Sequence, residues 1–319
     1  MDVLRTIKYN ILKGYLFIFV QQKERNMSSY QVKNDVLSVS VDTSGAGLTS
    51  IKDKTGLEYL WQGNPDYWSG QAPILFPICG SLRNEKAKIG DNKFCSMGRH
   101  GIARRCEFTL RHLDIDSISL FLRADAETMK SFPYDFELEM TYRIKDKTVI
   151  VEHTVTNHDS EVMPYFVGGH PAFHCPLNDG EAFEDYIIEF EKPETAGCPV
   201  LTEDGLVNTS NRKTFLENES SFGVKHELFY DDALIFDTLA SRSASLMHKE
   251  TGKGIRVDFE DFDYLGIWSS ANDGPFVAIE PWSGTSTCSD EDDIFEHKRG
   301  VRMLAPGQSE TLAYTISVL

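Results

Sequence analysis

The chain has 319 residues, 41% of them hydrophobic, and a formal net charge of −17, which allows a substantial core in one large domain or two ordinary ones. Nucleic acid and anionic membranes are bound through lysine and arginine, so this acidic surface argues against both as partners. The same negative charge disfavours a polyanionic substrate, so we expect an uncharged small molecule as the partner.

The first 26 residues differ from the rest of the chain. They are basic and contain a short apolar stretch, Tyr15 to Val20. That stretch is far shorter than the roughly 20 residues that a transmembrane helix needs, and Lys13 interrupts the apolar run that a signal peptide would require. We therefore predict that residues 1–29 are an N-terminal extension outside the fold and that residues 30–319 form a single domain.

From Asp35 onward the dominant pattern is an alternation of apolar and polar residues. Phe136, Leu138 and Met140, for example, alternate with polar neighbours. A period of two is typical of strands with one buried face, which antiparallel sheets packed in layers require. The pattern recurs in residues 37–41, 118–122, 149–155, 255–259 and 312–318, and turn residues punctuate it at 53–56, 145–147 and 306–307.

Helical periodicity is scarce in this chain. The candidates are residues 290–297, with Ser289 as a possible N-cap, and a turn near residues 127–131. Without regular crossover helices a parallel α/β sheet is disfavoured. We predict an all-β fold, a large antiparallel β-sandwich with few short helices.

The six cysteines are scattered and form no C-x-x-C pair. This spacing fits neither a zinc ribbon nor a disulfide framework, so we predict reduced thiols and a cytoplasmic location. The chain also lacks a phosphate-binding loop, a dinucleotide fingerprint, a nucleophile elbow and the H-E-x-x-H zinc motif. The sequence therefore supports neither a cofactor nor a metal.

Three segments join an ionisable residue to unusual backbone chemistry: residues 99–104, 168–173 and 278–282. They contain His100, His170 and Glu280, and a proline directly follows the last two. Because proline cannot donate to a strand ladder, we expect His170 and Glu280 where strands end, at a rim that can form a cleft. Each residue alone also has a structural explanation, as a hydrogen-bonded histidine or a solvent-facing carboxylate.

As an ordered set, these and other motifs resemble the aldose 1-epimerase (galactose mutarotase-like) superfamily, and most closely its LacX-like branch. The resemblance runs from about Asn34 to the C-terminus. The motifs are moderately specific singly and strong in this order: residues 61–63, 71–80, 100–104, 169–173, 264–268 and 280–282.

The resemblance implies a mutarotase-like sandwich and an isomerase that interconverts the α and β anomers of a hexose without a cofactor. It implies His170 as the general acid and Glu280 as the general base. We expect a monosaccharide substrate and a monomer or weak homodimer. The other implied positions bind the sugar: Arg83, His100, Asp232 (with Asp231 open as the alternative) and Trp268, which could equally be a core residue.

Mutarotation requires one base and one acid near a single acetal-like carbon. A carboxylate with a pKa of about 4.3 and a histidine with a pKa of about 6.5 supply both near neutrality. Four alternatives stay open. They are a glycoside hydrolase with two carboxylates, a hexose 6-phosphate mutarotase using Arg83, Arg99, Arg104 or Arg105, a non-catalytic carbohydrate-binding module, and a zinc site at His170, His174 and Cys175.

Overall fold

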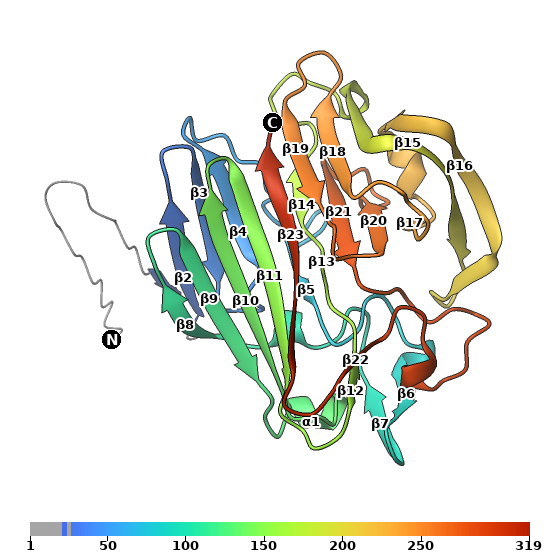
Figure 1. The fold of residues 1–319 in the computed structure, drawn as a ribbon. Helices are drawn as coiled ribbons and strands as arrows, with labels where there is room; N and C mark the ends of the chain where they lie inside the picture. The colour runs from blue at the N-terminus through green and yellow to red at the C-terminus, as the bar shows by residue number, and fades with distance from the viewer. Residues whose placement is uncertain (1–20, 24–26) are drawn as a thin grey trace, which may run out of the picture.

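The computed structural model describes residues 21–23 and 27–319 (Figure 1). Most of the predicted N-terminal extension, residues 1–29, lies outside the described residues. Strand β2 begins within it and pairs Ser29 with Asp42 of β3. The resulting four-stranded sheet has the order β1 (Gln21–Lys23), β2 (Met27–Lys33), β3 (Leu37–Asp42) and β4 (Leu48–Asp53).

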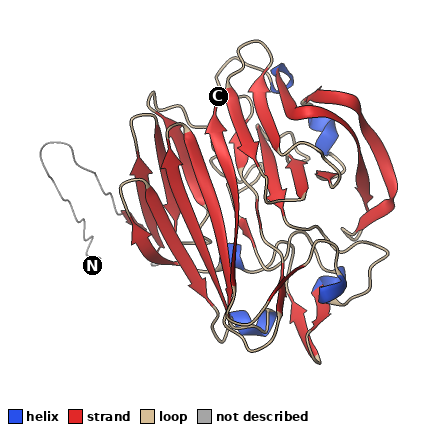
Figure 2. Cartoon of the chain, in the orientation of Figure 1, coloured by secondary structure: helices blue, strands red, loops and turns tan. Residues whose placement is uncertain are grey.

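A nine-stranded antiparallel sheet forms the largest layer, as the predicted sandwich requires (Figure 2). Its inner face is built by the alternation seen in the sequence: in β10 every second residue from Phe136 to Ile144 is buried. The register continues the face across the sheet, since Met140 lies opposite His153, which lies opposite Leu312. In spatial order the strands are β16 (Val207–Gly223), β15 (Tyr186–Leu201), β18 (Ser243–His248), β19 (Gly254–Asp258), β23 (Ser309–Val318), β11 (Thr148–Asn157), β10 (Phe136–Lys145), β9 (Ser117–Arg123) and β8 (Thr109–Leu113).

A smaller six-stranded sheet packs on this layer. The contact is close at Gly169, where a Cβ atom would lie 2.5 Å from the Tyr314 hydroxyl oxygen of β23. Burying both apolar faces against each other is the main stabilisation of such a sandwich. The sheet has the order β17 (Leu234–Phe236), β20 (Tyr264–Trp268), β21 (Phe276–Trp282), β13 (Gly168–Gly169) and β5 (Ile74–Leu75), with β14 (Ala172–His174) also paired to β21.

The remaining elements are short. The predicted turn near residues 127–131 is the helix α1 (Thr128–Ser131). The predicted helix at residues 290–297 is wrong, because only the 3₁₀ turn η5 (Phe295–His297) forms there. The others are the strands β6 (Lys86–Ile89), β7 (Lys93–Ser96), β12 (Met163–Tyr165) and β22 (Arg302–Leu304), and the 3₁₀ turns η1 (Arg83–Glu85), η2 (Ala103–Arg105), η3 (Phe183–Asp185) and η4 (His226–Phe229).

Candidate active site

His170 and Glu280 lie opposite each other on neighbouring segments of the six-stranded sheet. Glu280 is in β21, and His170 lies between the short strands β13 and β14. Because both short strands pair with β21 in one antiparallel register, position 170 lies across from position 280, where cross-strand side chains meet. His170 Nε2 lies 3.2 Å from Glu280 Oε2. The register is fixed by two pairs, Gly168 with Trp282 and Ala172 with Ala278.

The prediction that a strand ends at Glu280 is wrong, since β21 continues through Pro281 to Trp282. The backbone N–H of Ile279 donates to the carbonyl of Pro171 at 3.1 Å. Pro281, two residues further on, faces the same side of the strand, opposite Gly169 of β13 by the register of Gly168 with Trp282. A residue without an N–H is tolerated there because β13 is only two residues long and forms one ladder pair with β21, so little pairing is lost.

A glycine makes room for the carboxylate on its other side. Gly266 of β20 pairs with Glu280. A Cβ atom at this glycine would lie 2.7 Å from Cζ2 of Trp282 and 3.3 Å from Cβ of Glu280. Only a residue without a side chain therefore lets Glu280 and Trp282 adopt their positions.

The two ionisable side chains are almost completely removed from solvent: the His170 side chain is 9% exposed and that of Glu280 is 1% exposed. Within the described part of the chain, His170 Nδ1 and Glu280 Oε2 have no hydrogen-bond partner. The 3.2 Å contact of Glu280 Oε2 is with the other ring nitrogen, Nε2, and lacks hydrogen-bond geometry. Buried polar atoms are normally paired, so unpaired ones that line a pocket are available to a ligand.

Burial moves the pKa values of the pair in opposite directions. It raises the pKa of Glu280 well above the usual carboxyl value, and the nearby charge of Asp232 raises it further. Burial lowers the pKa of His170 to about 3, and Arg104 and Arg99 contribute to the lowering. The neutral form of each group is therefore favoured. When the pair holds one proton between them, that proton lies on Glu280.

His100 holds a fixed orientation beside this pair. Its ring centroid lies 5.5 Å from that of His170, and its Nδ1 accepts a hydrogen bond from the backbone N–H of Gly80 at 3.1 Å. Burial lowers the pKa of His100 well below its usual value. The neutral ring thus carries its proton on Nε2 and can donate from that atom. Its φ of 67° is a left-handed conformation that costs energy in a non-glycine residue and is often found at functional sites.

Two tryptophans pack against His170. The Trp268 ring, at the end of β20, lies 5.4 Å from His170 edge to face and lines the same pocket. Trp68, which the sequence analysis did not select, stacks on His170 with ring centroids 4.9 Å apart. Its loop is held by the Trp61 indole N–H, which donates to the Trp68 carbonyl at 2.8 Å. The only sequence signal for it is the aromatic pair Tyr67-Trp68 within a polar turn.

Asp232, rather than Asp231, lines the same pocket as His170 and Glu280. Its carboxylate forms an ion pair with Arg99 at 3.0 Å, whereas Asp231 is exposed and pairs with Lys213. Arg104 also lines the pocket. Its Nε atom is buried and has no hydrogen-bond partner among the described residues.

These side chains enclose a pocket of about 200 Å³. We call it the catalytic pocket. It opens beside a wider groove of about 1100 Å³. The catalytic pocket is lined by Trp68, Arg99, His100, Arg104, His170, Leu201, Asp232, Ala233, Ile235, Trp268, Glu280, Trp282 and Ser286.

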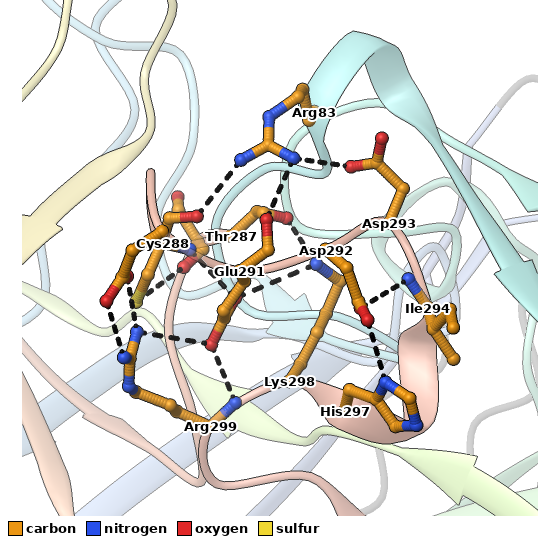
Figure 3. Close-up of polar contacts among 12 residues, drawn as sticks. Arg83, Thr287, Cys288, Glu291, Asp292, Asp293, Ile294, His297, Lys298 and Arg299 are labelled. Carbon is orange, nitrogen blue, oxygen red and sulfur yellow. Dashed lines mark hydrogen bonds and ion pairs between the residues drawn. The ribbon is translucent and has the colours of Figure 1, made fainter.

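Arg83 does not line this pocket, in contrast to the predicted substrate-binding role. Its guanidinium forms an ion pair with Asp293 at 2.7 Å and donates to the carbonyls of Cys288, Ser289 and Glu291 (Figure 3). These bonds hold residues 288–293 in an irregular loop, where a helix beginning after Ser289 was predicted. Arg99 and Arg104 are the arginines of the pocket.

The structure gives no donor set for a metal: among the described residues, no three His, Cys, Asp or Glu side chains gather in a way that could hold an ion. His174 packs on Trp61 instead, with ring centroids 5.5 Å apart. Within residues 21–23 and 27–319, no helix has the length and apolar character needed to span a membrane.

Comparison with known proteins gives one consistent result. Residues 28–299 match the family described as aldose 1-epimerase. The chain is 46% identical over 295 residues to the chromosomal protein LacX of Lactococcus lactis, covering 91% of this chain and 99% of the relative.

Two solved structures share the fold. One is a galactose mutarotase related enzyme from Lactobacillus acidophilus, with a TM-score of 0.87 and 30% identity over 91% of this chain and 97% of that one. The other is a galactose mutarotase-like protein from Lactobacillus casei, with a TM-score of 0.85 and 28% identity over 91% of this chain and all of that one.

Proposed function

Because the chain belongs to the aldose 1-epimerase family, we propose that it interconverts the α and β anomers of a hexose by general acid–base ring opening and closing. The observation that carries this proposal is the 3.2 Å contact between His170 Nε2 and Glu280 Oε2 at the catalytic pocket. The two oxygens that exchange protons in mutarotation, the C1 hydroxyl and the ring oxygen, are bonded to the same carbon. An acid and a base that serve both must therefore lie close together.

In the proposed reaction, Glu280 removes the proton of the C1 hydroxyl while His170 delivers a proton to the ring oxygen. The C1–O1 bond becomes a carbonyl as the bond between C1 and the ring oxygen breaks, which gives an open-chain aldehyde. Rotation about the C1–C2 bond presents the other face of the carbonyl to the ring hydroxyl. The reverse proton transfers then close the ring as the opposite anomer, so the pair ends with the proton count it started with.

The buried environment suits these roles. A raised pKa makes the Glu280 carboxylate a stronger base, and a lowered pKa makes the His170 imidazolium a stronger acid, than the exposed side chains would be. The reactive state, with Glu280 ionised and His170 protonated, forms when the proton of the pair moves from Glu280 to His170. The unpartnered polar atoms of the pair are then matched by the hydroxyl and ring oxygen of the sugar.

The other pocket residues bind and orient the ring. His100 offers its Nε2 proton to a sugar hydroxyl, because its Nδ1 is occupied by the Gly80 N–H. Asp232 and Arg99, in the same lining, offer an acceptor and donors. The indole faces of Trp68 and Trp268 contact the apolar C–H face of the sugar. A glycoside hydrolase would need a second free carboxylate, and the ion pair with Arg99 ties up Asp232.

The test is the rate of anomer interconversion after α-galactose or α-glucose is freshly dissolved, followed by NMR of the anomeric protons. Each proton transfer contributes on the order of 10²–10⁴-fold, so Glu280→Gln should lower kcat by on the order of 10²–10⁴-fold. Glu250→Gln, an exposed carboxyl that lines neither the pocket nor the groove, is the matched control and should stay within about twofold of wild type. A folded Glu280→Gln protein with near wild-type rates would refute the mechanism.

One observation favours a second substrate, a hexose 6-phosphate. The buried Nε of Arg104 has no partner among the described residues, and arginine is well suited to phosphate. The same NMR assay with glucose 6-phosphate and galactose 6-phosphate decides between the two substrates. A kcat/KM at least tenfold above that of the free sugars would assign the phosphorylated hexose.

A further inference from the structure

Trp282 lines the catalytic pocket together with Glu280 and has no part in the proton transfers described above. It is 4% exposed, and its indole Nε1 is buried with no hydrogen-bond partner among the described residues. A buried donor without a partner costs free energy, and native proteins rarely keep one. At the wall of an active site, such a donor is available for a bond that forms during the reaction.

Two glycines on the neighbouring strands fix the orientation of this indole. In Figure 1 β21 runs between β20 and β13. A Cβ atom at Gly168 of β13 would lie 3.0 Å from Cδ1 of Trp282, and a Cβ atom at Gly266 of β20 would lie 2.7 Å from Cζ2. Nε1 lies between these two atoms on the rim of an indole. The edge that carries the N–H therefore spans β21 from one neighbouring strand to the other.

The indole leans along the strand toward Glu280. Glu280 and Trp282 are two residues apart in β21, so their side chains point to the same face of the sheet. Gly266, which the six-membered ring of the indole covers, is the register partner of Glu280. The same Cβ position at Gly266 would lie 3.3 Å from Cβ of Glu280. The rim of the indole and the stem of the carboxyl group thus meet above one glycine.

The ionised form of Glu280 needs donors that its surroundings largely withhold. Burial raises the pKa of Glu280 well above its usual value and Asp232 raises it further, whereas the N–H of Trp282 and the charge of Arg99 act in the opposite direction. Arg99 is already bound to Asp232 at 3.0 Å. A carboxylate has about four acceptor positions, and the C1 hydroxyl and His170 use two of them in the proposed reaction. The N–H of Trp282 has no other partner among the described residues and is placed to fill a third.

We propose that Trp282 is a positioning residue of the catalytic base, whose indole N–H donates to the Glu280 carboxylate in the reactive state and holds it toward the C1 hydroxyl. The proposal rests on the proposed function and deepens it by naming a group that stabilises the ionised base. Hydrogen bonds to an ionised acceptor are about twice as strong as neutral ones, so the contact tightens when the proton of the pair moves to His170. A donor already fixed in place stabilises that charge without reorganisation.

Trp282→Phe removes the N–H and keeps an aromatic ring at this position. It should lower kcat for anomer interconversion by about 10–100-fold, the effect of losing one hydrogen bond to a charged group. KM should change by less than about threefold, because the donor acts on Glu280 and not on the sugar. Benzothienylalanine at position 282 should cause the same loss. It replaces the N–H by sulfur in a ring of the same shape, and so separates the donor from the packing of the ring.

Tyr134→Phe is the matched control. It removes a hydroxyl group that is also buried without a partner among the described residues, on a fully buried side chain that does not line the catalytic pocket. Its kcat should stay within about twofold of wild type. Circular dichroism checks that each variant is folded.

The pH profile separates this role from a merely structural one. Loss of the donor favours the neutral carboxyl group, so the pKa of Glu280 rises and the alkaline limb of kcat/KM moves to higher pH. A loosened pocket that admits water would move the limb to lower pH, because solvation returns the pKa of a buried carboxyl group toward its usual value. The substitution leaves the titratable and charged groups that face Glu280 unchanged: His170, His100, Asp232, Arg99, Arg104 and Cys79.

Infrared spectroscopy measures the same carboxyl group without turnover. The difference between wild type and Glu280→Gln isolates the protonated C=O stretch of Glu280, and Trp282→Phe is compared in the same way with Trp282→Phe/Glu280→Gln. We expect a higher titration midpoint without the N–H. An equal or lower midpoint, or a kcat of Trp282→Phe within about twofold of wild type, would overturn the proposal and leave the proposed function standing. A wild type that interconverts no sugar would overturn the proposed function, and the infrared midpoint would still decide whether Trp282 donates to Glu280.

Discussion

The pH dependence of kcat/KM is the sharpest consequence of burying the acid–base pair. The reaction needs one proton on His170 and Glu280 together, because a pair with two protons has no base and a pair with none has no acid. If both side chains had their reference pKa values, about 4.3 and 6.5, the active fraction would fall about eightfold between pH 6 and pH 7.5.

Burial changes that expectation in a defined direction. The pKa of His170 is lowered to about 3 and that of Glu280 is raised well above the usual carboxyl value. The one-proton state then persists from just above pH 3 up to the raised pKa of Glu280. The alkaline limit of kcat/KM is therefore set by Glu280 rather than by His170, and between pH 6 and pH 7.5 kcat/KM should fall by less than the eightfold calculated for the reference values.

The assay is the initial rate of anomer interconversion at low substrate concentration, corrected for the uncatalysed rate in each buffer. Circular dichroism at each pH confirms that the protein stays folded. An alkaline limb centred near pH 6.5 would show that His170 titrates as an exposed histidine, and the account of the buried pair would then be wrong.

Three further outcomes follow from individual residues. Burial lowers the pKa of His153, in β11 between β10 and β23, to about 4. Below about pH 6.5 the unfolded chain binds a proton at this histidine and the folded chain does not. The free energy of unfolding of the wild type therefore falls as the pH drops from 6.5 to 4. His153→Phe removes this loss, and the free energy of unfolding of the variant relative to wild type should rise by on the order of 3 kcal/mol between pH 7 and pH 4 in urea titrations; a difference that does not vary with pH would contradict the assignment. Trp68→Ala removes the ring stacked on His170 and should lower kcat/KM for hexoses by about tenfold or more. An unchanged kcat/KM in this variant would contradict a role for the stacked ring. Arg83→Ala should leave KM within about twofold but destabilise the fold by about 1–3 kcal/mol, since it removes donors to three carbonyls of the 288–293 loop; a large rise in KM without loss of stability would return Arg83 to a substrate-binding role.

Six strands, β3, β9, β10, β11, β19 and β23, were predictable because each carries its own evidence. The alternation of Phe136, Leu138 and Met140 marks one face, and the structure buries that face. Period two is a local property, so it is readable without knowing the partner strand. The order of the nine strands is not local, since β19 pairs with β23 and β15 with β18 across long stretches of chain.

The pairing of His170 with Glu280 was inferred from resemblance and local chemistry, and the structure brings the two together. Their register could not be read from the sequence, because the ladder to β21 is interrupted between β13 and β14. The proline rule placed Glu280 at a strand end for a sound general reason. It failed because β21 continues past Pro281 to Trp282, which pairs with Gly168 of the short strand β13.

Trp68 and Arg83 show where sequence reasoning ends. Trp68 lies in a loop with no periodicity, and its value comes from a stacking contact with a residue about a hundred positions away. Arg83 has the residue type expected of a sugar-binding group, but the acidic segment near residue 290 lies closer and takes its guanidinium. Both outcomes depend on tertiary proximity.

We propose that His170 and Glu280 act as one proton-transferring unit on a single hemiacetal. The most direct measurement is magnetisation transfer between the α and β anomeric protons of a hexose at equilibrium, for wild type, His170→Asn, Glu280→Gln and the double variant. Both single variants should lose on the order of 10²-fold or more in exchange rate, and the double variant should be no slower than the worse single variant, because either loss disables the unit. A folded single variant that exchanges at the wild-type rate, or losses that add up in the double variant, would contradict the claim.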